Sequence, residues 1–307
     1  MKRLLILASL LFFAGCTGPA DQPAAGASRS PSGKLSVLAT TGMIADAARV
    51  VGGGHVEVAA LMGPGVDPHL YQPTARDQGK LKAARLIFYN GLHLEGKMVE
   101  IFESLAQQKR VVAVSSGISE GRLLLWKSSA GMHDPHIWFD VRLWQEAVRT
   151  IAQAYAETDP PHAADYERRA AEYLAELDGL DQYCRDRAAE LPDDERVLIT
   201  SHDAFHYFGG AYGFEVVGIQ GISTDSEAGL KAITDAVDLI RRRKIRAIFP
   251  ETSVPRAAIE RVAKDSSAKL GPELYSDALG SPDTSAGNYV GMIHTNIDNI
   301  VNSLKGR

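Results

Sequence analysis

The sequence predicts an α/β protein in which two lobes of mostly parallel strands are joined by one long helix. Three observations support this fold class. Short β-rich runs alternate with helical patterns in the early and late parts of the chain, which is typical of parallel βαβ units. Between these parts, about 30 residues show no strand signal and carry one apolar stripe, which indicates a long helix. The length of 307 residues also favours two domains over one.

The first lobe is expected over residues 35–161. Its strands are predicted where short runs are rich in aliphatic residues: 35–40, 56–61, 86–89 and 111–114. Its helices are predicted where apolar residues recur every three or four positions: 43–51, 74–84, 95–107 and 141–157.

The connecting helix is expected over residues 162–192. Pro160 and Pro161 interrupt the preceding helical pattern, and proline suits the first turn of a new helix. Apolar side chains then recur at three- and four-residue steps: Tyr166, Ala170, Tyr173, Leu174, Leu177, Leu180 and Cys184. A helix of this extent would be about 45 Å long.

The second lobe is expected over residues 193–307, where the alternation of strands and helices resumes. Strands are predicted at three places: 197–200, 215–217 and 247–250. Helices are predicted at four places: 204–212, 226–242, 254–266 and 289–304.

The first 34 residues are expected to lie outside the folded body. Two basic residues precede an apolar stretch over residues 4–13, which is shorter than the roughly 20 residues that span a bilayer and fits a secretory signal. The following Ala14-Gly15-Cys16 resembles a bacterial lipobox, so residues 1–16 are interpreted as a lipoprotein signal peptide with Cys16 as the lipidated residue. Residues 17–34 lack large apolar side chains and predict a flexible tether. We therefore expect an extracytoplasmic protein that is anchored to a bacterial membrane.

Composition excludes some classes of function. The formal net charge is −5 and no basic run is present, which argues against a nucleic-acid-binding protein. The only cysteine besides Cys16 is Cys184, so lipidation of Cys16 leaves no pair for an intramolecular disulfide.

Three histidines and one aspartate lie in contexts that favour a metal site. His69 and His136 each end an Asp-Pro-His triplet, and His202 follows a predicted strand. Proline fixes its own φ and restricts the residue before it, so each triplet is expected to hold its histidine on a stiff loop. The aspartate of each triplet is also placed to accept a hydrogen bond from the imidazole. With Asp277, these residues offer three nitrogens and one carboxylate, which suits zinc or another first-row divalent metal. Taken singly, each residue is equally consistent with an ordinary surface histidine or a helix-capping aspartate.

The chain resembles the zinc/manganese family of solute-binding proteins of ABC importers throughout residues 35–305. The motifs that carry this resemblance are Thr40-Thr41-Gly42-Met43-Ile44-Ala45-Asp46, Gly65-Val66-Asp67-Pro68-His69-Leu70-Tyr71-Gln72-Pro73-Thr74, Tyr89-Asn90-Gly91-Leu92-His93-Leu94-Glu95, Asp134-Pro135-His136-Ile137-Trp138-Phe139-Asp140, Ser201-His202-Asp203-Ala204-Phe205, Gly218-Ile219-Gln220-Gly221-Ile222-Ser223-Thr224, Tyr275-Ser276-Asp277-Ala278-Leu279-Gly280 and Tyr289-Val290-Gly291-Met292.

The resemblance implies two α/β lobes joined by a rigid backbone helix, with the metal bound in the cleft between them. It implies His69 and His136 as ligands from the first lobe, and His202 and Asp277 as ligands from the second. It further implies a protein that captures zinc or manganese and delivers the ion to a membrane permease with its ATPase subunit. We expect this protein to act as a monomer.

One departure from the family bears on the choice of metal. Specialised zinc members carry a long His- and acid-rich loop, whereas residues 117–132 contain no histidine. We therefore expect both zinc and manganese to bind, with zinc tighter and a second oxygen of Asp277 as an additional donor. His206, one helical turn after His202, and His133 are expected to lie outside the ligand set.

Two other functions fit a site of this kind. A zinc-dependent hydrolase would need a general base beside a metal-bound water, and Glu251 is the only obvious candidate. A structural carboxylate, or one that supports a metal ligand, is the role that suits Glu251 better. A surface adhesin with a structural metal is the second alternative. No His-Glu-x-x-His motif is present, and we expect a binding protein rather than an enzyme.

Overall fold

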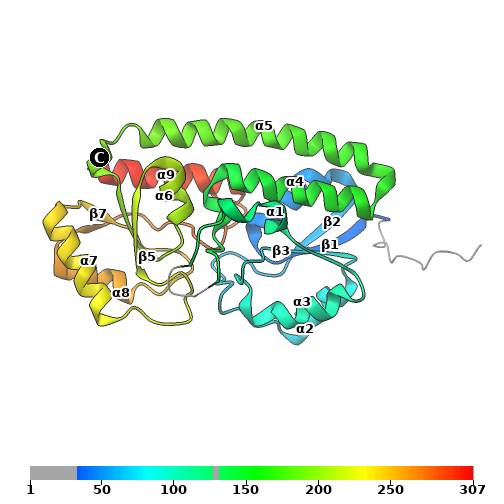
Figure 1. Ribbon diagram of the computed structural model, residues 1–307, viewed down its shortest axis with the longest axis horizontal. Helices are drawn as coiled ribbons and strands as arrows, with labels where there is room; N and C mark the ends of the chain where they lie inside the picture. The colour runs from blue at the N-terminus through cyan, green and yellow to red at the C-terminus, as the bar shows by residue number, and fades with distance from the viewer. Residues whose placement is uncertain (1–32, 127–130, 307) are drawn as a thin grey trace, which may run out of the picture.

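The computed structural model describes residues 33–126 and 131–306. The predicted signal peptide, the predicted lipidation site Cys16 and residues 17–32 of the predicted tether lie outside the described residues. Figure 1 shows an elongated body in which two α/β lobes lie side by side beneath one long helix. Within the described ranges, no helix has both the length and the apolar character needed to cross a membrane.

The first lobe is built on a four-stranded parallel sheet with the strand order β2-β1-β3-β4. The strands are β1 (Leu35–Ala39), β2 (Val56–Ala60), β3 (Leu86–Tyr89) and β4 (Arg110–Ala113). The helices are α1 (Gly42–Gly52), α2 (Ala75–Ala83), α3 (Val99–Ala106) and α4 (Val141–Thr158). Helix α3 begins later than the sequence predicts, because a 3-10 turn, η2 (Gly96–Met98), precedes it. Parallel strands place their carboxyl ends at one edge, and this edge faces the second lobe (Figure 1).

The second lobe repeats this plan on a smaller scale. Its strands are β5 (Val197–His202), β6 (Glu215–Gln220), β7 (Ala247–Ile248) and β8 (Lys269–Leu270). The pairs β5–β6 and β7–β8 are parallel, and a parallel bridge between Thr200 and Phe249 connects them. The helices are α6 (His206–Tyr212), α7 (Leu230–Arg243), α8 (Ala257–Ser266) and α9 (Tyr289–Lys305).

Helix α7 begins four residues after the predicted position, and a side chain explains why. The amide of Gln220, at the end of β6, donates hydrogen bonds to the carbonyls of Thr224 (3.0 Å) and Ser226 (2.6 Å). These bonds hold residues 221–229 as an irregular loop, which we call the bridging loop. Strand β8 was not predicted, since its two residues are exposed and lack a hydrophobic run.

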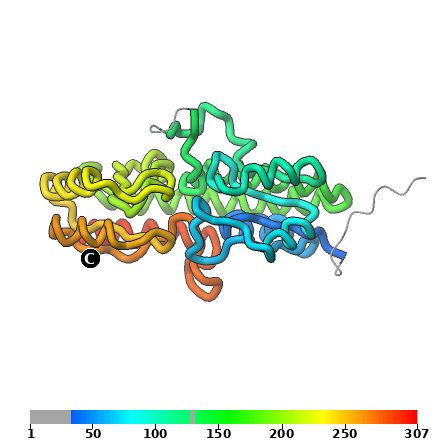
Figure 2. Tube along the Cα trace, turned by 90° about the horizontal axis from the view of Figure 1, so that it is seen from below, coloured from blue at the N-terminus to red at the C-terminus, as the bar shows by residue number. Residues whose placement is uncertain are grey.

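Helix α5 (Ala163–Ala188) lies along both lobes. Its 26 residues correspond to about 39 Å. One face, which includes Tyr166, Leu177 and Leu180, is buried in a hydrophobic core that continues into helices of both lobes, among them α1 and α4 of the first and α9 of the second. Cys184 is buried on the same face, and burial raises the pKa of its thiol to about 12. Figure 2 shows the two lobes next to each other along the long axis of the molecule.

Candidate metal centre

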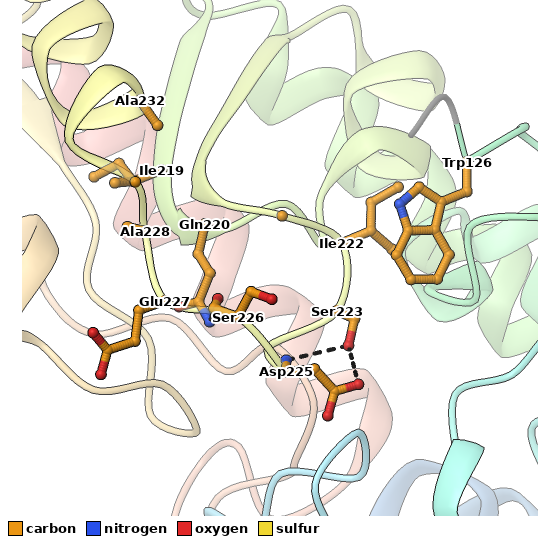
Figure 3. A pocket seen from close by; sticks show the side chains of 12 residues that line it. Trp126, Ile219, Gln220, Ile222, Ser223, Asp225, Ser226, Glu227, Ala228 and Ala232 are labelled. Carbon is orange, nitrogen blue, oxygen red and sulfur yellow. Dashed lines mark hydrogen bonds between the residues drawn. The ribbon is translucent and has the colours of Figure 1, made fainter. Parts of the chain in front are cut away.

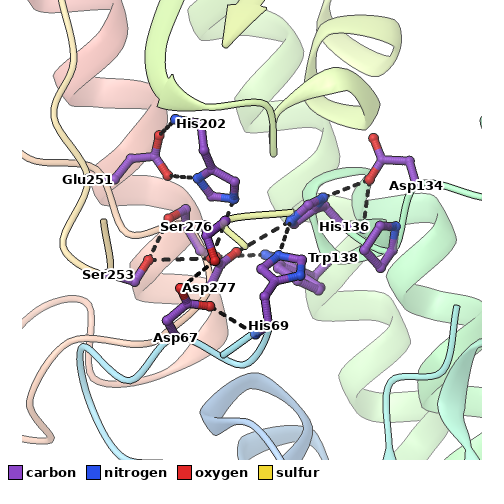
Figure 4. Close-up of polar contacts among 12 residues, drawn as sticks. Asp67, His69, Asp134, His136, Trp138, His202, Glu251, Ser253, Ser276 and Asp277 are labelled. Carbon is purple, nitrogen blue, oxygen red and sulfur yellow. Dashed lines mark hydrogen bonds and ion pairs between the residues drawn. The ribbon is translucent and has the colours of Figure 1, made fainter. Parts of the chain in front are cut away.

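The four predicted ligands meet in one buried group between the lobes (Figure 4). Each offers one donor atom, and these atoms all lie within 4.8 Å of one another: His69, His136, His202 and Asp277. Nε2 of His69 lies 3.3 Å from Nε2 of His136. The carboxylate of Asp277 lies between two rings, 3.5 Å from Nε2 of His136 and 3.4 Å from Nε2 of His202.

The ligands come from four separate places in the fold. His202 is the last residue of β5, at the edge of the sheet where ligands of α/β proteins bind. His136 precedes a 3-10 turn, η5 (Ile137–Phe139), which leads into α4. Asp277 lies in the irregular segment between β8 and α9. His69 lies in the irregular connection between β2 and α2, which we call the ligand loop (residues 61–74).

Two buried carboxylates fix the orientation of two of the imidazoles. Asp134 Oδ1 accepts from Nδ1 of His136 at 2.7 Å, as the Asp-Pro-His triplet predicts. Glu251 Oε2 accepts from Nδ1 of His202 at 2.5 Å, and its other oxygen accepts from the backbone N–H of His202. A proton on Nδ1 leaves the lone pair of Nε2 free for an ion, so both rings present the correct atom to the site.

Asp67, in the other triplet, makes a different contact from the one predicted. Its Oδ1 accepts from the backbone N–H of His69 at 2.8 Å and not from the imidazole. Its Oδ2 accepts from the hydroxyl of Thr224, in the bridging loop of the second lobe, at 2.6 Å. Asp67 therefore positions the backbone of His69 and does not bond to its ring.

The surrounding charges hold the four groups in distinct protonation states. Burial lowers the pKa of His69 to about 3, so its ring is neutral. Burial also acts to lower the pKa of His136, but Asp134 and Asp277 outweigh it and raise the pKa to about 9. For His202, Glu251 and Asp277 outweigh burial and raise the pKa well above its ordinary value. Burial opposes the charge of Asp277, yet the two imidazoles hold the pKa of this carboxyl well below its usual range.

The donor set suits a divalent cation. Nε2 of His202 and Oδ1 of Asp277 are buried without a hydrogen-bond partner in the described part of the chain, and leaving buried polar atoms unpaired is unfavourable. A metal ion between the rings would contact both atoms. Three imidazole nitrogens with one carboxylate are a typical ligand set for zinc and for other first-row divalent metals.

The remaining histidines near these motifs lie outside the ligand group. His206 is hydrogen-bonded to Asp203 at 2.9 Å, His133 is partly exposed, and His93 is exposed. The sequence favoured a supporting carboxylate at Glu251 but did not pair it with His202, and it did not assign Thr224 as a partner of Asp67. Thr224 does lie within a motif that carries the family resemblance, which is the only sequence signal for it.

Comparison with known proteins identifies the family. A family model described as the zinc-uptake complex component A, periplasmic, matches residues 37–303. The chain belongs to this family. The zinc-binding protein TroA of Treponema pallidum is 46% identical over 277 residues, which cover 89% of each chain. The manganese-binding lipoprotein MntA of Bacillus subtilis is 43% identical over 284 residues, 91% of this chain and 92% of the relative.

Solved structures of relatives have the same fold. The periplasmic zinc-binding protein TroA from Treponema pallidum superposes with a TM-score of 0.86 at 45% identity, over 89% of this chain and 99% of that one. A manganese-bound periplasmic metal-binding protein from Candidatus Liberibacter asiaticus gives 0.80 at 26% identity, over 88% and 100% of the two chains. These findings confirm the resemblance, the α/β fold class and the predicted function class, the extracytoplasmic metal-binding component of an ABC importer.

Proposed function

We propose that this protein binds one zinc or manganese ion through His69, His136, His202 and Asp277 and delivers it to the permease and ATPase of an ABC importer. The observation that supports this proposal most directly is the convergence of four buried donor atoms within 4.8 Å of one another. Its relatives include proteins named for zinc and for manganese, at similar identity.

The donor set favours zinc over manganese in intrinsic affinity. Affinity for divalent ions rises along the first transition series from manganese towards copper and stays higher for zinc than for manganese. Because the availability of each metal also decides which ion occupies a site, a higher affinity for zinc is compatible with manganese transport. A second oxygen of Asp277 would complete the coordination of either ion.

A hydrolase is less well supported than a carrier. The carboxylate of Glu251 accepts two hydrogen bonds from His202, so its oxygens are engaged in orienting a ligand. It is therefore not placed as a free general base beside a metal-bound water. We propose that the protein has no enzymatic activity, and that any adhesive role is secondary to metal capture.

The proposed organisation follows from the sequence predictions. We propose lobes at residues 35–161 and 193–307, with the connecting helix at 162–192, in a monomeric protein. We propose that lipid on Cys16 anchors the protein on the outer side of a bacterial membrane. Fatty-acid labelling that persists after Cys16→Ser substitution would remove the anchor from this proposal.

Calorimetric titration of chelator-stripped protein with zinc and with manganese tests the ligand set. Replacing any one of His69, His136, His202 or Asp277 by alanine should weaken zinc binding by about 100-fold or more, because each supplies a bond that no neighbour replaces. His206→Ala and His133→Ala are the matched controls and should bind like the parent protein. Near-parental affinity in Asp277→Ala would remove that residue from the site.

A further inference from the structure

His69 is restrained less than the other three ligands. The rings of His136 and His202 are fixed by Asp134 and Glu251, and Asp277 lies between those rings. Among the described residues, no side chain forms a hydrogen bond with Nδ1 of His69. Apart from the contact of its Nε2 with Nε2 of His136 at 3.3 Å, the position of His69 therefore depends on its backbone.

The backbone of His69 belongs to an irregular segment that packs on the first lobe but has few hydrogen bonds to the second. The ligand loop contains no helix or strand over residues 61–74. Its first two residues bond to the end of β1. Beyond them, among the described residues, one hydrogen bond ties the loop to the second lobe: the hydroxyl of Thr224 donates to Asp67 at 2.6 Å. The same carboxylate accepts from the N–H of His69 at 2.8 Å, so the contact acts on a ligand through one intervening side chain.

Thr224 is itself held in place. The residue is only 7% exposed, and its carbonyl accepts from the side-chain amide of Gln220 at the end of β6. A continuous chain of contacts therefore runs from the sheet of the second lobe through Thr224 and Asp67 to His69. A further polar contact between the bridging loop and the first lobe, the ion pair of Lys97 with Asp225, is about half exposed and contributes little.

We propose that Thr224 is a positioning residue that latches the ligand loop to the second lobe and sets the rate at which the bound metal leaves. This inference rests on the proposed ligand set. While the latch is closed, Asp67 holds His69 against the other three donors. When the latch opens, His69 is the ligand that moves away, because the remaining three are restrained by buried contacts.

The matched control lies one residue away in the same loop. Ser223 donates to and accepts from Asp225 within the bridging loop, at 3.0 and 3.3 Å, and Figure 3 shows this pair at the rim of a cavity of about 430 Å³. Ser223→Ala removes a hydroxyl from this loop without touching Asp67. Thr224→Val removes the donor at nearly constant volume, and Thr224→Ser retains it.

Zinc release into an excess of a chromophoric chelator, followed by stopped flow, tests the latch. Thr224→Val should release zinc about tenfold faster, since a hydrogen bond to a carboxylate is lost and Asp67 keeps an unpaired oxygen. The association rate should change little. Thr224→Ser and Ser223→Ala should both release zinc at the parental rate. A parental rate in Thr224→Val, or an equal acceleration in Ser223→Ala, would overturn the proposal.

Amide hydrogen exchange of the metal-free protein gives a second test that does not require zinc to bind. Thr224→Val should speed exchange at residues 63–69 and leave exchange in β5 unchanged, whereas Ser223→Ala should leave both unchanged. Unchanged exchange at residues 63–69 in Thr224→Val would overturn the latch. Failure of the parent protein to bind zinc would instead contradict the proposed function, while exchange would still decide the latch.

Discussion

Carboxylates determine the character of the site as much as imidazoles do. Asp134 and Glu251 turn two rings so that Nε2 faces the centre, and Asp277 lies between those rings as an anion. In the metal-free protein, the raised pKa values of His136 and His202 place protons where the cation is expected to lie. At the proposed site, metal capture would thus exchange protons for one divalent cation.

This exchange predicts a pH dependence in an unusual range. A histidine with an ordinary pKa of ~6.5 is neutral at neutral pH and competes with metal only below about pH 6. His136, with its pKa raised to about 9, stays protonated up to that pH in the metal-free protein. The apparent affinity for manganese should therefore fall steadily as the pH is lowered from about 9 to about 7. His69 should contribute nothing there, since its pKa is lowered to about 3.

Competition titrations of manganese between about pH 7 and about pH 9 test this pH dependence. Calorimetry in two buffers with different ionisation enthalpies should also show protons released on binding at neutral pH. An affinity for manganese that is flat between about pH 7 and about pH 9 would show that the imidazoles of His136 and His202 are already neutral. That result would contradict the raised pKa of His136.

Contacts at the site between residues close together in the sequence could be predicted, whereas contacts between distant residues could not. Asp134 lies two residues before His136, so local geometry sets their hydrogen bond and the triplet predicts it. Glu251 lies 49 residues from His202, and Thr224 lies 157 residues from Asp67, so only the folded chain brings these pairs together. Local propensity carries no information about such contacts.

At the scale of elements, the helices and strands in regular runs were predicted within a few residues. The start of α7 was misplaced because the side chain of Gln220 bonds to nearby carbonyls and holds the bridging loop out of the helix. Helix α5 was predicted from its apolar stripe, and its buried face contains the expected tyrosines, leucines and Cys184.

One glycine in α5 offers a test of this helix. Gly179 lies on its exposed face, and an added methyl group would meet no atom within 4 Å. Gly179→Ala should stabilise the protein by about 0.5–1 kcal/mol in denaturant unfolding, because glycine loses more backbone entropy in a helix than alanine does. Metal affinity should not change.

The opposite effect is expected at Gly53, just after α1. Its φ of +53° is unfavourable for alanine, and an added methyl group would lie 2.4 Å from the side chain of Arg169. Gly53→Ala should therefore destabilise the protein. Equal effects of the two substitutions would show that at least one site does not behave as its geometry indicates.

The whole molecule is bound together by a core that crosses from one lobe to the other. Helix α5 packs on helices of both lobes without interruption, and its apolar face belongs to the same core as α9. Behind the site, the indole N–H of Trp138 donates to the carbonyl of Ser276, and the hydroxyl of Tyr289 donates to the carbonyl of Trp138. A hinge needs residues that can change φ and ψ freely, and neither connection offers them.

We therefore expect only small movement of the lobes when metal binds. Small-angle scattering should give the same radius of gyration for metal-free and zinc-loaded protein, with rearrangement confined to the ligand loop. Re-stripping the loaded sample with chelator provides the control. A clear decrease in radius of gyration on loading, reversed by the chelator, would contradict a continuous core.

The contacts of His136 have a consequence for how the bound metal ion is transferred to the permease. This residue belongs to the first lobe by sequence, yet Tyr207 of the second lobe donates to the carbonyl of Asp134, and Phe139 stacks on Phe205 at 4.2 Å. At the proposed site, His136, His202 and Asp277 would thus form a preassembled tridentate chelate, with His69 as the fourth and less restrained donor. An incoming ion would bind the three fixed donors before His69. On departure, the denticity would drop from four to three before it dropped to zero, so the ion would still be held and oriented when its first new ligand arrives.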